Sequence, residues 1–130
     1  MISVILSLGS NAGERHKLIA DSLELLKRHL ISFEESSSYE TPAVGNSKGS
    51  YLNCVVSAVF NGTHGELEVL CKDIEKQLGR TGASKAAGVV PIDIDIVMVD
   101  DKVVKTWDFR QEFFRIGYSQ LTHNKVISTN

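Results

Sequence analysis

Apolar residues recur along this chain with two different periods. Residues 2–8, 51–60 and 91–99 are apolar at every second position or more often, which predicts β-strands. Residues 14–30 and 64–78 instead place apolar side chains three or four positions apart between charged ones, which predicts two amphipathic helices. These five segments form the predicted framework of the fold.

The remaining segments are less regular. Residues 31–39 are rich in serine and predict a weaker strand, which we expect to end at Thr41-Pro42 because the residue before a proline avoids helical angles. Residues 43–50 and 80–90 lack periodicity and are predicted to be loops.

Beyond the last long strand, the pattern predicts smaller elements. Residues 103–106 are expected to pair back as a hairpin strand after the turn at Asp100-Asp101. A short helix is expected around residues 110–116, followed by a frayed tail over about 120–130.

The predicted order is βαββαβ, the split βαβ or ferredoxin-like arrangement. We therefore predict an α+β fold, in which both helices cover one face of an antiparallel sheet and the other face is open to a ligand. Strand alternation places Tyr51, Asn53, Asp93 and Asp95 together on that open face. A length of 130 residues fits one domain spanning residues 1–130.

Composition narrows the classes of function. A net charge of −2 is too small to favour nucleic acid or an acidic membrane surface, and no apolar run reaches the roughly 20 residues of a membrane helix. Cys54 and Cys71 lie inside periodic segments and are expected to be reduced core thiols. The four histidines lack metal-ligand spacing. These features predict a cytoplasmic protein of small-molecule chemistry; they leave its oligomeric state open.

Asp93 and Asp95 are the strongest chemical signal. Aspartate is depleted in strands, and two at positions i and i+2 project side by side, about 6–7 Å apart at Cα. Like charges at this spacing are unfavourable unless a cation lies between them, and magnesium prefers one or two carboxylates with waters and phosphates. The alternative is a pair of solvated aspartates on an exposed sheet face.

Other candidates are weaker when taken singly. Tyr51 offers a ring for stacking and Asn53 an amide for hydrogen bonding, although both also suit a plain outer face. Arg80 is able to reach a phosphate or, equally, to complement a helix C-terminus. Glu75 is typical of a solvated helix charge.

Five short motifs, taken in their order along the chain, link these candidate residues to one family of proteins. They are Leu8-Gly9-Ser10-Asn11, Tyr39-Glu40-Thr41-Pro42-Ala43-Val44-Gly45, Tyr51-Leu52-Asn53, Glu75 with Leu78-Gly79-Arg80, and Asp93-Ile94-Asp95-Ile96. This ordered set resembles the 6-hydroxymethyl-7,8-dihydropterin pyrophosphokinase family over about residues 2–101. The resemblance implies pyrophosphoryl transfer from ATP to the pterin hydroxymethyl group in folate biosynthesis, with release of AMP.

The resemblance also implies a role for each matching residue. Asp93 and Asp95 are expected to hold two magnesium ions that bridge the ATP phosphates, and Arg80 to steady those phosphates during catalysis. The expected pterin site has Tyr51 stacked on the ring and Asn53 on its edge, with Thr41, Pro42 and Val44 lining the pocket. The expected nucleotide side comprises Glu75, Arg80, Lys85, Arg110 and Arg115. The two predicted loops are expected to close over ATP.

The chain departs from the family in two places. Between Thr81 and Val90 its second loop carries only Lys85 as a cation, and Val90 stands where the family has an arginine. Its C-terminal motifs also differ, so Arg110 or Arg115 is expected to replace lost phosphate contacts, and Phe113 or Tyr118 to supply a second stacking ring. Two rivals to the enzyme follow: a non-catalytic relative that binds pterin or nucleotide, and a structural module that associates through its open sheet face.

Overall fold

The computed structural model describes residues 1–44 and 49–128, with side chains as far as Thr122. Half of the predicted loop at 43–50 and the last residues of the predicted tail therefore lie outside the described residues. The elements in chain order are β1 (Ile2–Ser10), α1 (Arg15–Lys27), β2 (Leu30–Glu35), β3 (Tyr39–Pro42), β4 (Ser50–Phe60), α2 (His64–Gln77), α3 (Gly82–Ala86), β5 (Asp93–Val99), β6 (Lys102–Val103), α4 (Thr106–Arg110) and α5 (Glu112–Ser128).

The strands form one antiparallel sheet in the order β2-β4-β1-β5-β6, with β3 also paired to β4. The two long central strands, β1 and β4, pair from Ile2 opposite Phe60 to Ser10 opposite Leu52. β5 lies on the other side of β1 and also runs antiparallel to it. Strands β1, β2, β4 and β5 thus have the ferredoxin-like order, and the predicted fold class is confirmed.

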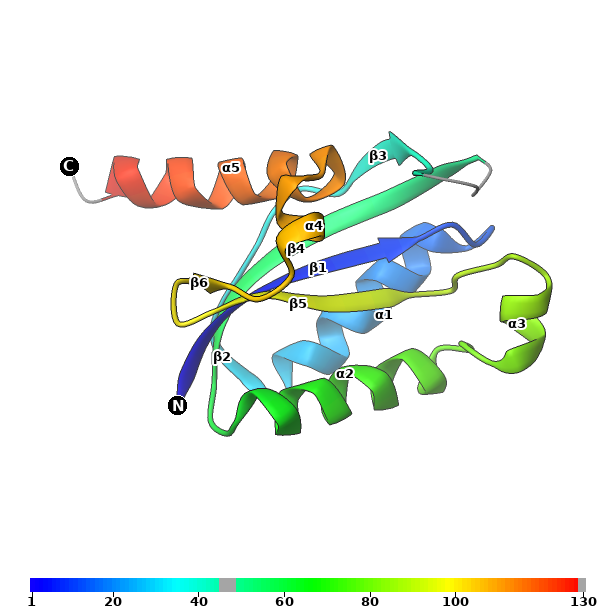
Figure 1. Ribbon diagram of the computed structural model, residues 1–130, viewed down its shortest axis with the longest axis horizontal. Helices are drawn as coiled ribbons and strands as arrows, with labels where there is room; N and C mark the ends of the chain where they lie inside the picture. Colours follow the sequence, from blue (N-terminus) through cyan, green and yellow to red (C-terminus); the bar gives the residue numbers. More distant parts are fainter. Residues whose placement is uncertain (45–48, 129–130) are drawn as a thin grey trace.

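Helices α1 and α2 lie against one face of this sheet, as the periodicity predicted (Figure 1). Their buried stripes, which include Leu26 and Leu67, pack against inward-facing strand residues such as Leu6 and Val56. Thr63 caps α2 with a capping box, in which its hydroxyl accepts from the Glu66 amide while the Glu66 side chain accepts from the Thr63 amide. The larger hydrophobic core therefore lies between these two helices and the sheet.

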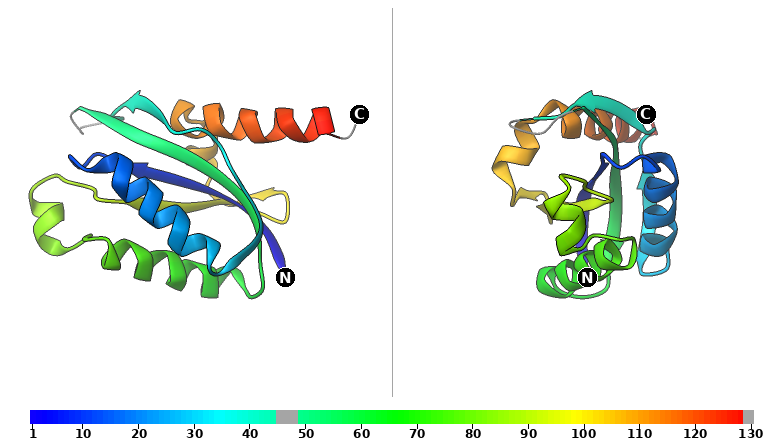
Figure 2. Two further views of the ribbon diagram at one scale, coloured as in Figure 1. Left: turned by 180° about the vertical axis from the view of Figure 1, so that it is seen from behind. Right: turned by 90° about the vertical axis from the view of Figure 1, so that its right-hand side faces the viewer.

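The opposite face is open only in part, because α4 and α5 lie on it (Figure 2). Val55 and Val97 point to this face, and together with Met98 they pack under Phe114 and Leu121 of α5. The two buried valines explain why helices cover this part of the sheet, because shielding apolar side chains from water stabilises the fold. The expectation of a helix-free second face holds only at the end where Tyr51, Asn53, Asp93 and Asp95 lie.

Two local predictions differ from the structure, and one agrees with it. The strand predicted at 31–39 is two strands, β2 and β3, separated where the Ser36 hydroxyl accepts from the Val55 amide at 2.9 Å. Thr41-Pro42 forms the end of β3, so a strand does end there as expected. The segment predicted as a loop at 80–90 contains α3, a single turn whose Thr81 cap exchanges hydrogen bonds with Ser84.

The C-terminal prediction also falls short of the structure. In place of a short helix and a frayed tail, α4 is followed by a helix that continues to Ser128. Leu121 is 3% exposed, so the packed core reaches into the segment predicted to fray. Among the described residues, no helix is both long and apolar enough to cross a bilayer.

Candidate active site

A cavity of about 180 Å³ opens where the ends of β1, β3, β4 and β5 meet the start of the C-terminal helices. The start of β5 supplies two carboxylates, and β4 supplies an aromatic ring and an amide. The lining residues are Ser7, Leu8, Gly9, Thr41, Pro42, Val44, Tyr51, Asn53, Asp93, Asp95, Trp107, Asp108 and Phe113. Every residue predicted for pterin contact is therefore in one cavity, next to both predicted metal ligands.

Asp93 and Asp95 project from β5 on the same side, because alternate residues of a strand share a face. Asp93 pairs with Gly9 of the central strand and Asp95 with Ser7. The side chains remain accessible, 39% exposed for Asp93 and 20% for Asp95, while Ile94 between them is buried in the core on the opposite face. The strand thus anchors itself with isoleucines and presents its carboxylates to the cavity.

The two carboxylates titrate as a pair. Burial and the neighbouring charge of Asp93 raise the pKa of Asp95 to about 7. Burial acts in the same direction on Asp93, but hydrogen bonds from Asp95 and Arg80 hold the pKa of Asp93 below its usual value. Asp95 therefore keeps its proton to a higher pH than an ordinary aspartate, as expected for two carboxylates too close to be ionised together without a cation.

Magnesium fits this donor set. Among the described residues no group of three or more histidine, cysteine, aspartate or glutamate side chains could hold a metal ion. A pair of carboxylates is the number that magnesium takes when phosphate oxygens and waters complete its octahedron. The pair is thus suited to a metal that arrives with a phosphorylated ligand rather than to a closed protein cage.

Two protein cations contact this pair. The Arg80 guanidinium donates to Asp93 at 2.8 Å and lies 3.2 Å from a Glu75 oxygen. Lys105, immediately before α4, donates to Asp95 through its ammonium group. Although partial burial opposes it, this bond raises the pKa of Lys105, so the lysine is charged whenever Asp95 is ionised. Arg80 was predicted from the sequence, whereas Lys105 was not.

Glu75, predicted to contact nucleotide, is placed as a support for β5. It is 7% exposed, and its carboxylate accepts from the Ile94 amide at 2.8 Å, between the two aspartates in sequence. Burial raises its pKa, with the Ile94 amide and Arg80 opposing. Glu75 also lines a second cavity of about 420 Å³ between α2 and β5, on the other side of Asp93 and Asp95. The two cavities share only these aspartates.

Asn53 is held in a fixed orientation. It is 2% exposed, and its Nδ2 donates to the Thr41 hydroxyl at 2.8 Å and to the backbone carbonyl oxygens of Tyr39 and Tyr51. Because Nδ2 is occupied by the protein, Oδ1 is the Asn53 atom that can accept from a ligand. A Cβ on Gly9 would lie 3.5 Å from this oxygen and 3.6 Å from the Tyr51 ring, so the absence of a side chain at Gly9 leaves space beside both groups.

Aromatic rings from the C-terminal helices complete the cavity. Trp107 and Phe113 both line it, with ring centroids 5.9 Å apart and planes tilted by 48°. Of the two candidates for a second stacking ring, Phe113 is therefore in place. Tyr118 instead stacks on Phe114 at 5.2 Å, meets the Phe109 ring edge-on at 5.8 Å, and belongs to the smaller core.

The remaining predicted nucleotide residues divide. Lys85 lines a third cavity of about 630 Å³ with Arg80, Lys76 and Val90. Asn11 fixes one wall of this region, because its side chain accepts from the Val90 amide at 2.6 Å and donates to Gly88. The Gly9-Ser10-Asn11 turn thus anchors the second loop through the Asn11 side chain and through the Asn11 backbone amide, which donates to the Val90 carbonyl oxygen at 3.1 Å.

Arg110 and Arg115 line none of these three cavities. The Arg115 guanidinium lies 5.5 Å from the centroid of the Phe109 ring, which places it over the C-terminal core. The structure therefore does not bring either arginine to the aspartate pair. Lys105, Trp107 and Asp108 stand at the site instead, and their only signal in the sequence was their position soon after the aspartate strand.

The site combines a planar, partly aromatic pocket with a carboxylate pair and flanking cations, which is the arrangement of an enzyme that transfers phosphoryl groups to a flat ligand. Residues 5–128 match the model of the 7,8-dihydro-6-hydroxymethylpterin-pyrophosphokinase family. The chain belongs to this family.

Individual relatives agree with the family match. Proteins named 2-amino-4-hydroxy-6-hydroxymethyldihydropteridine pyrophosphokinase are 37% identical over 107 residues in Aquifex aeolicus and 39% identical over 103 residues in Porphyromonas gingivalis. These alignments cover 82% and 75% of this chain, and 66% and 69% of the relatives. A folate synthesis bifunctional protein of Arabidopsis thaliana is 32% identical over 109 residues, covering 78% of this chain and 22% of that protein. The chain thus spans about two thirds of the bacterial relatives.

Proposed function

We propose that this chain transfers a pyrophosphoryl group from ATP to 6-hydroxymethyl-7,8-dihydropterin, forming the pterin diphosphate and AMP, with Mg²⁺ held by Asp93 and Asp95. The observation that carries the proposal is the single cavity that joins Tyr51 and Asn53 to the aspartate pair. Membership of the pyrophosphokinase family supports the reaction. The names of the relatives describe enzymes, and none favours a non-catalytic binding protein.

The pterin is expected to lie flat in the 180 Å³ cavity. Tyr51 and Phe113 supply rings for its two faces, with Trp107 at the rim. Asn53 Oδ1 accepts from an N–H on the pterin edge, since Nδ2 is already committed to Thr41. This placement directs the hydroxymethyl group toward Asp93 and Asp95, the polar end of the cavity.

The triphosphate is expected in the second cavity, on the α2 side of the aspartates. Four cations line that cavity, namely Lys72, Lys76, Arg80 and Lys105. Arg80 is already oriented toward the reaction centre by its bonds to Asp93 and Glu75. Lys85 stands farther out along the same side, in the third cavity.

The reaction needs no covalent intermediate on the protein. The substrate hydroxyl attacks the β-phosphorus and AMP leaves, so that the chain's task is alignment and neutralisation of charge. When bound, magnesium would supply Lewis-acid stabilisation of the phosphate oxygens. Asp93 and Asp95 line both cavities, so the pterin hydroxyl and the ATP phosphates are expected to meet beside these two carboxylates.

We propose that the site holds two magnesium ions, as the family resemblance implies. We also propose a cytoplasmic location, because ATP is available there and because free, buried cysteines such as Cys54 and Cys71 suit a reducing compartment. Counting bound metal per chain in the presence of an ATP analogue tests the first. Fractionation of the source cells tests the second.

The deciding experiment supplies ATP, the dihydropterin and Mg²⁺ and follows AMP by chromatography. Formation of AMP that requires all three supports the proposal. Absence of AMP, with tight binding of pterin by calorimetry, would instead support the binding-protein alternative. Neither AMP nor pterin binding would leave only a structural module.

A further inference from the structure

We infer that Lys105 is a phosphate-binding cation of this site, held by Asp95 in the metal-free chain and released to the polyphosphate when a divalent cation takes its place. The inference rests on the proposed function and deepens it. Between Thr81 and Val90 the second loop has only Lys85 as a cation. The inference is that the segment after β5 supplies part of the missing positive charge for the phosphates.

The backbone of Lys105 is fixed relative to the aspartates. The amides of Val104 and Lys105 both donate to the Val97 carbonyl oxygen, at 2.9 and 3.3 Å, so that the chain returns to β5 two residues beyond Asp95. Lys105 also accepts from Phe109 and so begins α4. A lysine at this position reaches Asp95 with its side chain while the main chain stays in place.

The ammonium group lies among acids that a metal would neutralise. Burial lowers the pKa of Lys105, but its hydrogen bond to Asp95 and the charges of Asp95, Asp108 and Asp93 raise it above its usual value. The side chain is 44% exposed and lines the 420 Å³ cavity that faces α2, where the other cations stand. It can therefore leave Asp95 without breaking a packed core.

Arg80 and Lys105 occupy the two aspartates in the same way, one cation each. The partners are two residues apart on one strand, so their Cα atoms are separated by about 6–7 Å. Two cations held on neighbouring carboxylates of one strand are placed to contact the phosphates of a single polyphosphate chain. Once Mg²⁺ neutralises the carboxylates, attraction to the phosphate oxygens replaces attraction to Asp93 and Asp95.

This account predicts effects of opposite sign for one substitution. In Lys105→Met the competing charge beside Asp95 is gone, so Mn²⁺ without nucleotide should bind about three- to tenfold more tightly. The same variant loses a charged contact to phosphate, so the magnesium complex of α,β-methylene-ATP should bind about 10- to 100-fold more weakly. A lysine that only braces the fold would weaken both.

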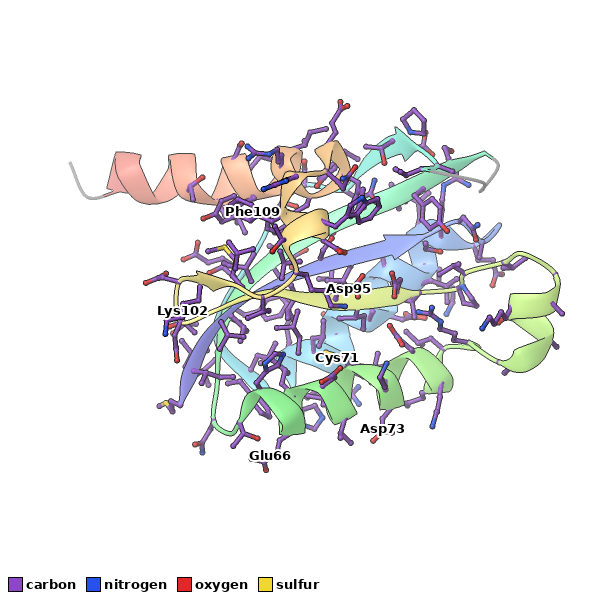
Figure 3. All side chains as sticks on the ribbon, viewed as in Figure 1. Glu66, Cys71, Asp73, Asp95, Lys102 and Phe109 are labelled. Carbon is purple, nitrogen blue, oxygen red and sulfur yellow. The ribbon has the colours of Figure 1, made fainter. Side chains whose placement is uncertain are left out.

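The experiment measures free Mn²⁺ by electron paramagnetic resonance and analogue binding by calorimetry. Lys105→Arg keeps the charge and should restore analogue binding to within about tenfold of the parent. Lys102→Met is the matched control: Lys102 is exposed at the tip of the β5–β6 hairpin, away from Asp95 (Figure 3), and should change neither affinity. Thermal melting of each variant shows that the fold is kept.

Unchanged analogue affinity in Lys105→Met, or weaker binding of both ligands, overturns the inference. The result is separable from the proposed reaction. If AMP forms but the opposite-sign pattern is absent, only the role of Lys105 fails. If the pattern is present but no AMP forms, only the transfer reaction fails.

Discussion

Tyr39 and Gly117 are joined by a hydrogen bond in which the Gly117 amide donates to the Tyr39 hydroxyl at 2.9 Å, and the same hydroxyl donates to the Phe113 carbonyl oxygen at 2.6 Å. The first turns of α5 are thereby fixed to β3, next to the cavity. Phe113 lies inside this linked segment, so the position of one wall of the pterin pocket depends on the contact.

Gly117→Ala should therefore destabilise the protein and loosen the pterin site. A Cβ at Gly117 would lie 2.6 Å from Val55 Cγ2 and 2.8 Å from the Tyr39 hydroxyl, so that α5 must move away from β4. We expect a loss of about 1–3 kcal/mol in the free energy of unfolding, measured by urea denaturation. Gly65→Ala in α2 is the control, because its Cβ meets nothing closer than 3.9 Å; it should be neutral or stabilising. Equal behaviour of the two variants would contradict this packing.

Tyr39→Phe should have a smaller effect of the same kind. It removes the hydroxyl and leaves the Gly117 amide and the Phe113 carbonyl without this partner, at a cost of about 1–2 kcal/mol. Burial raises the pKa of Tyr39 to about 12, so the contact should persist at pH 10. Chemical denaturation of both proteins measures the cost; an unchanged midpoint would show that the bond contributes nothing.

Metal-free protein should lose stability as the pH rises through neutrality. The pKa of Asp95 is raised from 3.8 to about 7 in the folded state, so its contribution is fully present below pH 3.8 and is lost as the pH passes 7. Asp93 has the opposite shift, and its contribution changes only at lower pH. Asp95→Asn should thus gain about 1–3 kcal/mol relative to the parent between pH 5 and pH 8, less than the full shift because Lys105 loses its partner.

Melting temperatures at pH 5 and pH 8 measure this difference. Added Mg²⁺ should raise the melting temperature of the parent at pH 8 more than at pH 5, and should do little for Asp95→Asn. A parent protein whose stability is the same at both pH values, with and without magnesium, would show that repulsion between the two carboxylates does not destabilise the folded state.

Asp95→Ala should reduce turnover by at least about 10³-fold while the fold is kept, because one of two metal ligands at the reaction centre is lost. Asp73→Ala is the control, since Asp73 is exposed on α2 and points away from the sheet (Figure 3). Circular dichroism checks the fold of both. Full activity of Asp95→Ala would contradict the mechanism.

Val90→Arg should raise the rate. Val90 lines the third cavity with Arg80 and Lys85, and its backbone is fixed by Asn11, so an arginine there is aimed at the phosphate side. One added charged contact in the transition state corresponds to about tenfold or more. The comparison is Ala86→Arg, at an exposed position of α3 that lines none of the three cavities. No change in kcat for Val90→Arg would mean that another residue already fills this role.

Much of the fold follows from local pattern. Alternation in β4 and β5 was enough to place Tyr51, Asn53, Asp93 and Asp95 on one face, because the period of a strand is fixed by its backbone. The cover over Val55 and Val97 was missed, although both are apolar positions of that same face. The long α5 was missed too, since Gly117 and Ser119 interrupt its apolar pattern and its stability comes from contacts distant in sequence.

The site shows the same division. Asp93 and Asp95 could be predicted because their chemistry is unusual in a strand. Glu75 could not be recognised as a support for β5, because its partner amide at Ile94 is 19 residues away and nothing local marks it. Lys105 and Trp107 reach the site only because the β5–β6 hairpin and α4 turn the chain back, which no short-range pattern encodes.

The most direct test of the central claim is the identity of the products, resolved by mass spectrometry after ATP, dihydropterin and Mg²⁺ are mixed with the parent chain. The account predicts pterin diphosphate and AMP in equal amounts, absent when the Asp95→Ala chain is used. Formation of ADP with a pterin monophosphate, or the same yield from Asp95→Ala, would contradict it.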